Sequence, residues 1–101
     1  MRLVYITARN SAEAKKISGH LLKKKLAGCV NIFPVESMYW WDGEMQEDVE
    51  FVLLVKTAND NFERIEKAVL EIHSYEIPAI YSWKVDKISR KYDEWISKNS
   101  S

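Results

Sequence analysis

The segment HSYEIP, residues 73–78, carries the side chains of this sequence that are best suited to chemistry. His73 stands three positions before Glu76, and an imidazole together with a carboxylate can bind a divalent ion of borderline softness such as Cu²⁺. The same histidine is also suited to close a helix, where it would hydrogen-bond the last carbonyls and complement the helix dipole. Both interpretations stand at this point, because a tight metal site usually needs three or four ligands.

Cys29 is the one cysteine in the chain, so no internal disulfide can form. A lone free cysteine is most often a small buried hydrophobic residue, but its thiolate is also a soft metal ligand. We therefore predict His73, Glu76 and Cys29 as candidate ligands for a divalent metal ion. The sequence contains no CxxC, HExxH or clustered His/Cys motif, and so indicates no zinc site.

Three consecutive aromatic residues, YWW at 39–41, precede an Asp42-Gly43 turn. They could stack on a ligand or form an apolar arm that clasps a neighbouring chain. We favour the arm, because adjacent strand residues point to opposite faces and one tryptophan should then be buried either way. Downstream, Asp48 and Glu50 share one strand face with Lys56, where they could bind a cation or pair with lysines.

The composition is typical of one folded domain spanning residues 1–101, with 47% apolar and 30% charged residues. Fifteen basic residues balance fifteen acidic ones, which argues against a nucleic-acid partner and leaves little charge repulsion to oppose self-association. The start MRLVYITARN has too short an apolar run for a signal peptide, and no stretch approaches the roughly 20 apolar residues that span a bilayer. We expect a cytoplasmic protein with no membrane partner.

No P-loop, nucleophile elbow or dinucleotide fingerprint occurs in the sequence. Arg9 and Asn31 occupy positions at which acylphosphatases carry catalytic residues, but the loop ITARNSAEA has no glycine to form a phosphate cradle. The aromatic pattern of RNA-recognition domains is also missing. We therefore expect a protein that is not an enzyme.

Hydrophobic periodicity predicts a strand over 3–7, followed by a helix that starts in a capping box formed by Asn10 and Glu13 and stops before Gly28. A strand over 29–41 comes next. Pro34 predicts a bulge or a sheet edge within that strand, because proline cannot donate to a ladder.

The second half begins with the Asp42-Gly43 turn, which predicts a type I′ hairpin and a return strand over 45–57. A second capping box, Asp60 with Glu63, predicts a helix that ends near His73. The remaining elements are a strand over 79–85 and a helix capped by Ser89. The order is β-α-β-β-α-β-α.

This order predicts an α+β fold, namely the ferredoxin-like sandwich with one appended C-terminal helix. Its helices should cover one face of a four-stranded antiparallel sheet, yet the strand over 3–7 is apolar on both faces at 4–6, and the strand over 45–57 is apolar on both faces at 52–55. The hairpin arms, at about 13 residues each, also exceed the usual 5–6. We therefore predict a homo-oligomer in which other copies cover the second face and pair with the strand edges.

Four segments in register resemble the CutA family of divalent-ion tolerance proteins. They are KKLAGCVN (24–31), YWWDG (39–43) with acidic residues at 48 and 50, KT (56–57) and HSYEIP (73–78). The resemblance covers nearly the whole chain. It implies a ferredoxin-like protomer, a homotrimer, a cytoplasmic role in tolerance of copper and other divalent ions, and a similarity to the trimeric PII signalling proteins.

Two positions depart from the family pattern. Ser74 stands where the family usually has proline, which should loosen the turn after His73. Ile6 stands about where some members carry a cysteine that could bind a soft metal, and isoleucine cannot. The function that follows is a homotrimeric, copper-binding tolerance protein. The alternative is a PII-like signalling or scaffold trimer that binds a small molecule or a partner between subunits.

Overall fold

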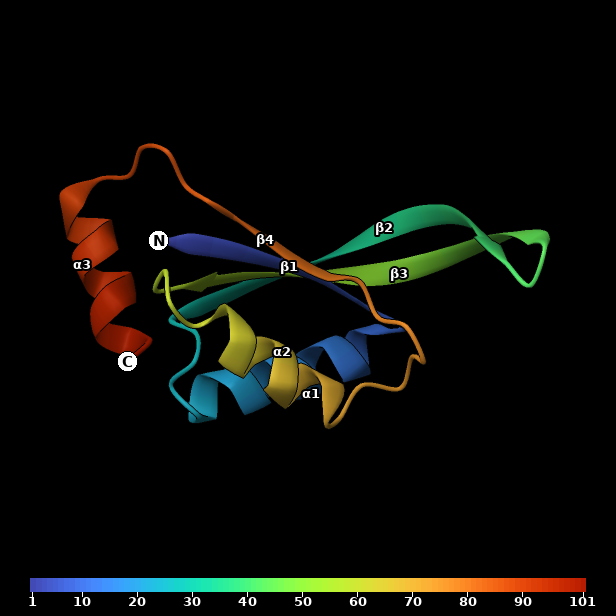
Figure 1. Cartoon of the computed structure of the whole chain (residues 1–101), viewed down its shortest axis with the longest axis horizontal. Coiled ribbons are helices and arrows are strands. Elements are labelled where there is room, and N and C mark those ends of the chain that lie inside the picture. Colours follow the sequence, from blue (N-terminus) through green and yellow to red (C-terminus); the bar gives the residue numbers. More distant parts are fainter.

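Seven elements follow one another along the chain in the predicted order β-α-β-β-α-β-α. The protein is described by a computed structural model that covers residues 1–101. The strands are β1 (Arg2–Ala8), β2 (Cys29–Trp41), β3 (Glu44–Thr57) and β4 (Ile80–Lys84), and the helices are α1 (Ser11–Lys23), α2 (Phe62–Leu70) and α3 (Arg90–Asn99) (Figure 1). None of the helices combines the length and the apolar character that crossing a membrane requires.

The four strands form one sheet in the order β2-β3-β1-β4, and every neighbouring pair is antiparallel. Helices α1 and α2 lie side by side against one face of this sheet, while α3 stands at the end of the sheet near the N-terminus (Figure 1). The predicted α+β class, with a four-stranded antiparallel sheet and three helices, is confirmed.

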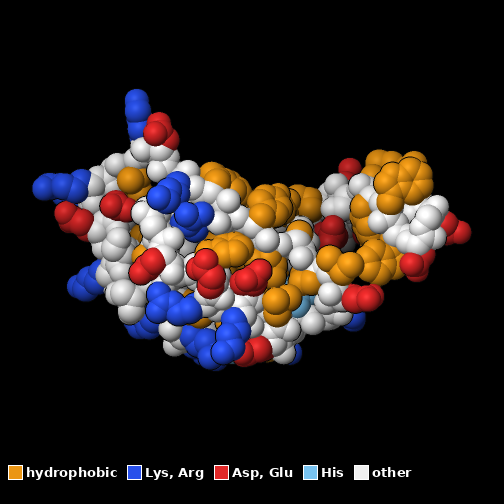
Figure 2. Space-filling model, in the orientation of Figure 1, with side chains coloured by type: hydrophobic (Ala, Val, Ile, Leu, Met, Phe, Trp, Pro, Cys, Tyr) orange, Lys and Arg blue, Asp and Glu red, His pale blue; other side chains and the backbone are white.

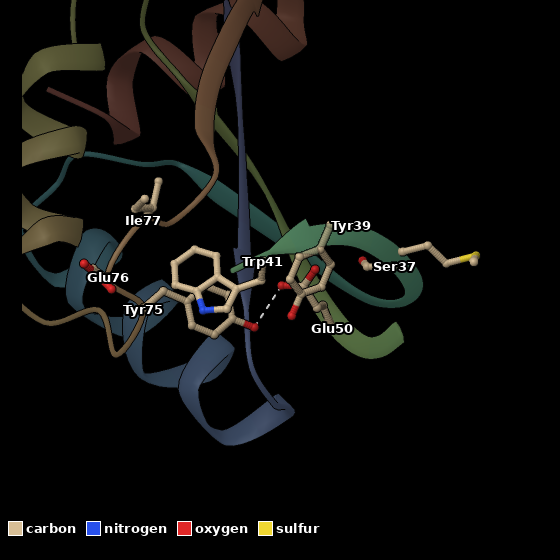
Figure 3. A pocket seen from close by; sticks show the side chains of 8 residues that line it. Ser37, Tyr39, Trp41, Glu50, Tyr75, Glu76 and Ile77 are labelled. Atoms are coloured by element: carbon tan, nitrogen blue, oxygen red, sulfur yellow. Dashed lines mark hydrogen bonds between the residues drawn. The ribbon is translucent and has the colours of Figure 1, made fainter. Parts of the chain in front are cut away.

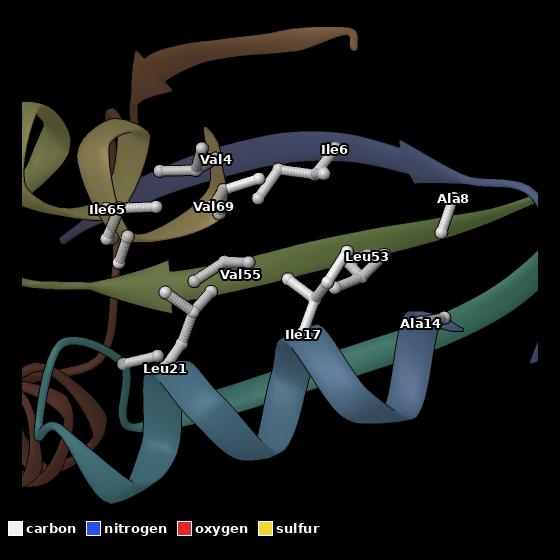
Figure 4. Close-up of a cluster of buried hydrophobic side chains, with 12 residues drawn as sticks. Val4, Ile6, Ala8, Ala14, Ile17, Leu21, Leu53, Val55, Ile65 and Val69 are labelled. Carbon is white, nitrogen blue, oxygen red and sulfur yellow. The ribbon is translucent and has the colours of Figure 1, made fainter. Parts of the chain in front are cut away.

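The hydrophobic core lies between the sheet and the two helices that cover it (Figure 4). Alternate residues of the central strands point to this side, because successive side chains of a strand face opposite ways. The helices meet them with residues at helical spacing, since positions three or four apart share one face. The fully buried members of this layer include Val4, Ile6, Leu53 and Val55 from the strands and Ile17, Leu21, Ile65 and Val69 from the helices.

The predicted capping box starts α1. The side-chain oxygen of Asn10 accepts a 2.8 Å hydrogen bond from the Glu13 N–H. The carboxylate of Glu13 reaches back one residue further than expected and accepts from the Arg9 N–H at 3.0 Å. One orphan donor of the helix start, the Glu13 N–H, is thereby satisfied, and the bond to Arg9 fixes the chain that enters the helix.

Gly28 does not end α1, in contrast to the prediction. The helix ends at Lys23, and Lys25 takes the left-handed conformation with φ 59°. The N–H groups of Lys25 and Leu26 then donate to carbonyls of the last turn, which is a Schellman motif with lysine where glycine is usual. Gly28 instead lies close to α3, where an added Cβ would make a tight contact of 3.2 Å with Ile96 Cδ1.

The second capping box is absent. Asn61, not Asp60, precedes α2, and its side chain makes no capping hydrogen bond. The buried amide of Asn61 instead donates to Thr57 Oγ1 at 2.9 Å and to the Ser100 carbonyl at 2.6 Å. It thereby ties the end of α3 to the sheet. The helix itself ends at Leu70, three residues before the expected His73.

Strands β2 and β3 form a long hairpin. Their register is unbroken, so Pro34 lies opposite Phe51 without a bulge and is tolerated because β2 is an edge strand. Asp42 and Gly43 both have positive φ, 51° and 77°, as a type I′ turn requires. Beyond the last pairing of β1, at Ala8, seven residue pairs of the hairpin have no third strand. This arm extends for about 23 Å.

Candidate functional site

His73 joins the end of α2 to the end of β1. Its Nε2 donates to the Thr7 carbonyl at 2.7 Å, and its Nδ1 accepts from the Tyr75 N–H at 3.0 Å. A carbonyl can only accept and an amide N–H can only donate, so these partners fix the neutral tautomer with the proton on Nε2. Both ring nitrogens are therefore occupied by the backbone, and neither has a free lone pair for a metal ion.

The turn after His73 is held by Ser74, the residue that departs from the family pattern. Its N–H donates to Glu13 Oε2 at 3.0 Å, a bond that proline could not make. Burial alone would raise the pKa of the Glu13 carboxyl, but hydrogen bonds from Ser74 and from the Arg9 N–H lower it below its usual range. The turn is thus anchored to the start of α1.

The other two predicted ligands lie apart from His73. Cys29 is half-buried at the start of β2, paired across the sheet with Lys56. Thr7, which His73 contacts, lies in the same row of the sheet as Phe33 of β2. Phe33 is four residues, or about 13 Å, along β2 from Cys29. No group of three or more His, Cys, Asp or Glu side chains is placed to hold a metal ion in one chain.

Glu76 lies at an open cleft of about 520 Å³ between the hairpin and the loop that follows α2. Tyr39 and Trp41 of β2 form one side of this cleft, while Tyr75, Glu76 and Ile77 of the loop form the other (Figure 3). We call it the hairpin cleft. Glu50 of β3 lies between the two sides, and Ser37 and Met38 complete the lining.

Two tyrosine–carboxylate hydrogen bonds organise the hairpin cleft. Tyr75 Oη donates to Glu50 Oε2 at 2.8 Å, drawn as the dashed line in Figure 3. Burial, with the hydrogen bond and the negative charge of Glu50, raises the pKa of the Tyr75 phenol far above its ordinary value, so the hydroxyl stays protonated. Tyr39 Oη donates in the same way to Asp48, which raises the pKa of Tyr39.

One of the two interpretations of the sequence predicted that the carboxylates of the hairpin pair with lysines. The structure shows no such pairs. The amine of Lys56 lies 3.2 Å from Tyr92 Oη, on the far side of the molecule from the hairpin tip. The expectation that one tryptophan of the arm is buried is also wrong for the single chain. Trp40 is 70% exposed and Trp41 is 41% exposed.

The charge segregation of the hairpin was missed because the whole chain is neutral. Residues 26–55 contain six acidic residues and no Lys or Arg, a formal charge of −6. Figure 2 shows Lys and Arg gathered over the helical end, whereas the hairpin end carries carboxylates and apolar side chains. A count of charge by segment would have revealed this feature from the sequence alone.

The sheet face opposite α1 and α2 is covered by no helix. Its aromatic residues form a row in which the rings of Tyr5 and Tyr81 stack at 5.0 Å between centroids, and those of Tyr81 and Trp83 at 6.3 Å. Tyr81 is 52% exposed, Trp83 43% and Phe33 39%. We call this row, with Phe33, the open face.

Comparison with known proteins shows which family this chain resembles. Residues 2–99 match the family model described as CutA1 divalent ion tolerance protein. A divalent-cation tolerance protein CutA from Archaeoglobus fulgidus is 39% identical over 95 residues, which cover 94% of this chain and 93% of that protein. A protein of the same description from Thermotoga maritima is 35% identical over 99 residues and covers 98% of both chains.

Solved structures agree with this placement. The structure of a periplasmic divalent cation tolerance protein CutA from Archaeoglobus fulgidus superposes with a TM-score of 0.97 at 37% identity, over 100% of both chains. A PII-like protein CutA from Nostoc gives a TM-score of 0.92 at 26% identity, over 100% of this chain and 98% of that one. The chain therefore belongs to the CutA1 divalent ion tolerance protein family.

Proposed function

We propose that the protein acts in the cytoplasm as a homotrimer of ferredoxin-like protomers that binds divalent cations, copper above all, and serves metal tolerance without catalysing a reaction. The observation that carries the proposal is the open face. A single chain of a divalent ion tolerance family exposes a row of aromatic side chains on its sheet.

Assembly follows from the energetics of that face. Aromatic side chains are enriched where protein surfaces meet, and each square ångström of apolar surface removed from water contributes about 25 cal/mol. The neutral net charge leaves little repulsion between copies. The hairpin arm adds an unpaired β2 edge, which can pair with a strand of another copy.

Metal binding in this proposal takes place between protomers. One chain offers no cluster of three ligands, so a site of three or four donors requires side chains from more than one copy. Glu76 has an exposed carboxylate without a hydrogen-bond partner and is the ligand that a neighbouring copy can reach most directly. Cys29 is half-buried, and His73 would have to release the Tyr75 N–H to bind an ion through Nδ1.

The oligomeric state is tested by analytical ultracentrifugation. We expect a mass of about 35 kDa at micromolar concentration, three times the 11.8 kDa chain. Trp83→Glu, on the open face, should lower the mass, whereas Trp95→Glu, an equally exposed tryptophan on α3, should not. A wild-type protein that sediments as a single chain would refute the trimer.

Copper binding is tested by calorimetric titration of the wild type, Glu76→Gln and Cys29→Ser with Cu²⁺. We expect both variants to bind more weakly, while His20→Ala, which removes the other histidine of the chain, should bind as the wild type does. Equal binding by the wild type and Glu76→Gln removes Glu76 from the site. Localisation is tested by fractionation of cells that produce the protein from its native gene.

The alternative is a PII-like trimer that binds a small molecule, and one observation favours it. A second cleft of about 450 Å³ lies beside α2 and is lined by Lys24, Arg64 and Lys67 together with Glu71. Three cations with one carboxylate favour an anionic ligand. Thermal-shift measurements with nucleotides and small anions separate the two functions, because stabilisation by an anion without any response to metal ions would favour the alternative.

A further inference from the structure

The second cleft, of about 450 Å³, lies on the helical side of the protein, where α2 meets the loop after α1. Helices α1 and α2 cover the sheet face opposite the open face (Figure 1). The copies that cover the open face in the proposed trimer therefore leave this cleft in contact with solvent. None of the candidate metal ligands lines it. We call it the helical cleft.

Three cations line the helical cleft, namely Lys24 from the end of α1 and Arg64 and Lys67 from α2. Arg64 and Lys67 are three residues apart and so lie on one face of their helix. The one ion pair of the protein is at the N-terminus and involves none of these side chains. Glu71 is the single carboxylate of the lining, which therefore has a formal charge of +2, three positive charges less one negative.

Arg64 is held in position by the protein core. Its Nη2 donates to Asn61 Oδ1. The amide of Asn61 is buried and is itself fixed by bonds to Thr57 Oγ1 at 2.9 Å and to the Ser100 carbonyl at 2.6 Å. The remaining N–H groups of the guanidinium can donate to an anion in the cleft. A guanidinium fixed before the ligand arrives loses little side-chain entropy on binding.

The charge of the lining decides which anion fits. A phosphate monoester carries about −1.5 to −2 charges at pH 7 and offers three strong acceptor oxygens. It therefore neutralises the excess charge of the lining and supplies one acceptor for each of the three cations. A carboxylate or a sulfate ester has a single negative charge and leaves one positive charge of the lining unbalanced.

The apolar part of the lining determines what the phosphate is attached to. Leu26 and Ala68 line the cleft beside the cations, and both pack on the hydrophobic core. The volume of the cleft is within the range of sites that take small organic molecules. Inorganic phosphate alone would leave the apolar part of the lining in water, whereas an ester can cover it.

We propose that the helical cleft binds small phosphate monoesters. The phosphate lies at Arg64, Lys67 and Lys24, and the organic body lies on Leu26 and Ala68. This ligand class narrows the anion-binding alternative given above, on which it rests. The site is built within one chain, so it needs neither a second copy nor a metal ion.

The test is calorimetric titration of the full chain with phenyl phosphate and phenyl sulfate at about pH 7.5, above the second pKa of the phosphate. The two compounds share an aryl body and differ in charge, and EDTA in the buffer removes metal ions that could bridge to either. We expect phenyl phosphate to bind about five- to tenfold more tightly than phenyl sulfate or inorganic phosphate. Equal affinity for phenyl phosphate and either competitor, or no binding, would overturn the proposal.

Matched variants locate the site. Lys67→Met should weaken phenyl phosphate binding about fivefold, whereas Lys16→Met, an exposed lysine of α1 outside the lining, should change it less than about twofold. Glu71→Gln removes the negative charge of the lining and should strengthen binding, whereas Glu63→Gln, an exposed carboxylate of α2 outside the lining, should leave it unchanged. Equal effects within either pair would contradict the site.

The same variants separate this site from the wider alternative. An anion that binds the wild type and Lys67→Met equally would support an anion-binding function at another place and overturn the helical cleft as its site. The sedimentation and copper titrations described above measure neither outcome, because the lining contains no residue of the open face and no candidate metal ligand.

Discussion

Replacing His73 by alanine should destabilise the protein in a buffer free of metal ions. The imidazole bridges two backbone groups, the Thr7 carbonyl at 2.7 Å and the Tyr75 N–H at 3.0 Å, and so joins β1 to the loop after α2. A histidine that served only as a metal ligand would contribute nothing to the apoprotein. The free energy of unfolding without metal therefore distinguishes a structural histidine from a purely metal-binding one.

The size of the effect follows from the two bonds. Each hydrogen bond contributes about 0.5–1.5 kcal/mol net, so losing both should lower the free energy of unfolding by about 1–3 kcal/mol. The ring also lies against Tyr75 with 4.8 Å between centroids, which favours the upper half of this range. For a chain of this size such a loss moves the urea midpoint down by about 1 M.

The assay is urea unfolding in EDTA, with all variants at the same protein concentration because assembly makes the midpoint depend on it. His73→Asn should lie between the wild type and His73→Ala, since an asparagine oxygen can accept the N–H two residues on but cannot reach Thr7. His20→Ala is the control, because Nε2 of His20 is buried without a partner. A midpoint of His73→Ala equal to that of the wild type would refute the structural role.

Three further substitutions test the fold. Lys25→Gly should raise the free energy of unfolding by about 1 kcal/mol, because φ 59° strains any residue with a Cβ; a lower urea midpoint would contradict the Schellman assignment. Asn61→Ala should lower it by about 2–4 kcal/mol, since the Ser100 carbonyl loses its buried donor, and an unchanged midpoint would contradict this. Folding lowers the pKa of Glu13, so its carboxylate stabilises the fold above about pH 4.5 and this contribution disappears as the pH falls through the folded-state pKa. Glu13→Gln should therefore unfold about 0.5–1 kcal/mol more easily than the wild type near pH 7 and equally near pH 3; a gap that persists in acid would contradict this.

The order of elements and the long hairpin could be predicted from the sequence because each depends on a local signal. Each signal acts within a few residues: the alternation of apolar residues along a strand, the N-cap at Asn10 and the turn at Asp42-Gly43. The errors concern contacts between distant segments. Asn61 stands at the N-cap of α2 in place of the predicted Asp60, and its side chain bonds Ser100, far along the chain, instead of capping the helix. Gly28 lies tightly against Ile96 of the last helix rather than ending α1.

The same difference between local signals and distant contacts explains why the cleft in the structure is not the site that the sequence predicts. His73 and Glu76 are predicted as a site because they are close in sequence. The hairpin cleft instead depends on the hydrogen bond between Glu50 and Tyr75, which are 25 residues apart. The loop reaches β3 because β1 ends at Ala8 and leaves the upper part of the hairpin without a neighbouring strand. The feature that exposes the arm for assembly thus also opens the space that the loop and its tyrosine line. Shortening the hairpin would therefore remove the cleft together with the arm, whereas Glu50→Gln changes the charge of the cleft and leaves the arm intact.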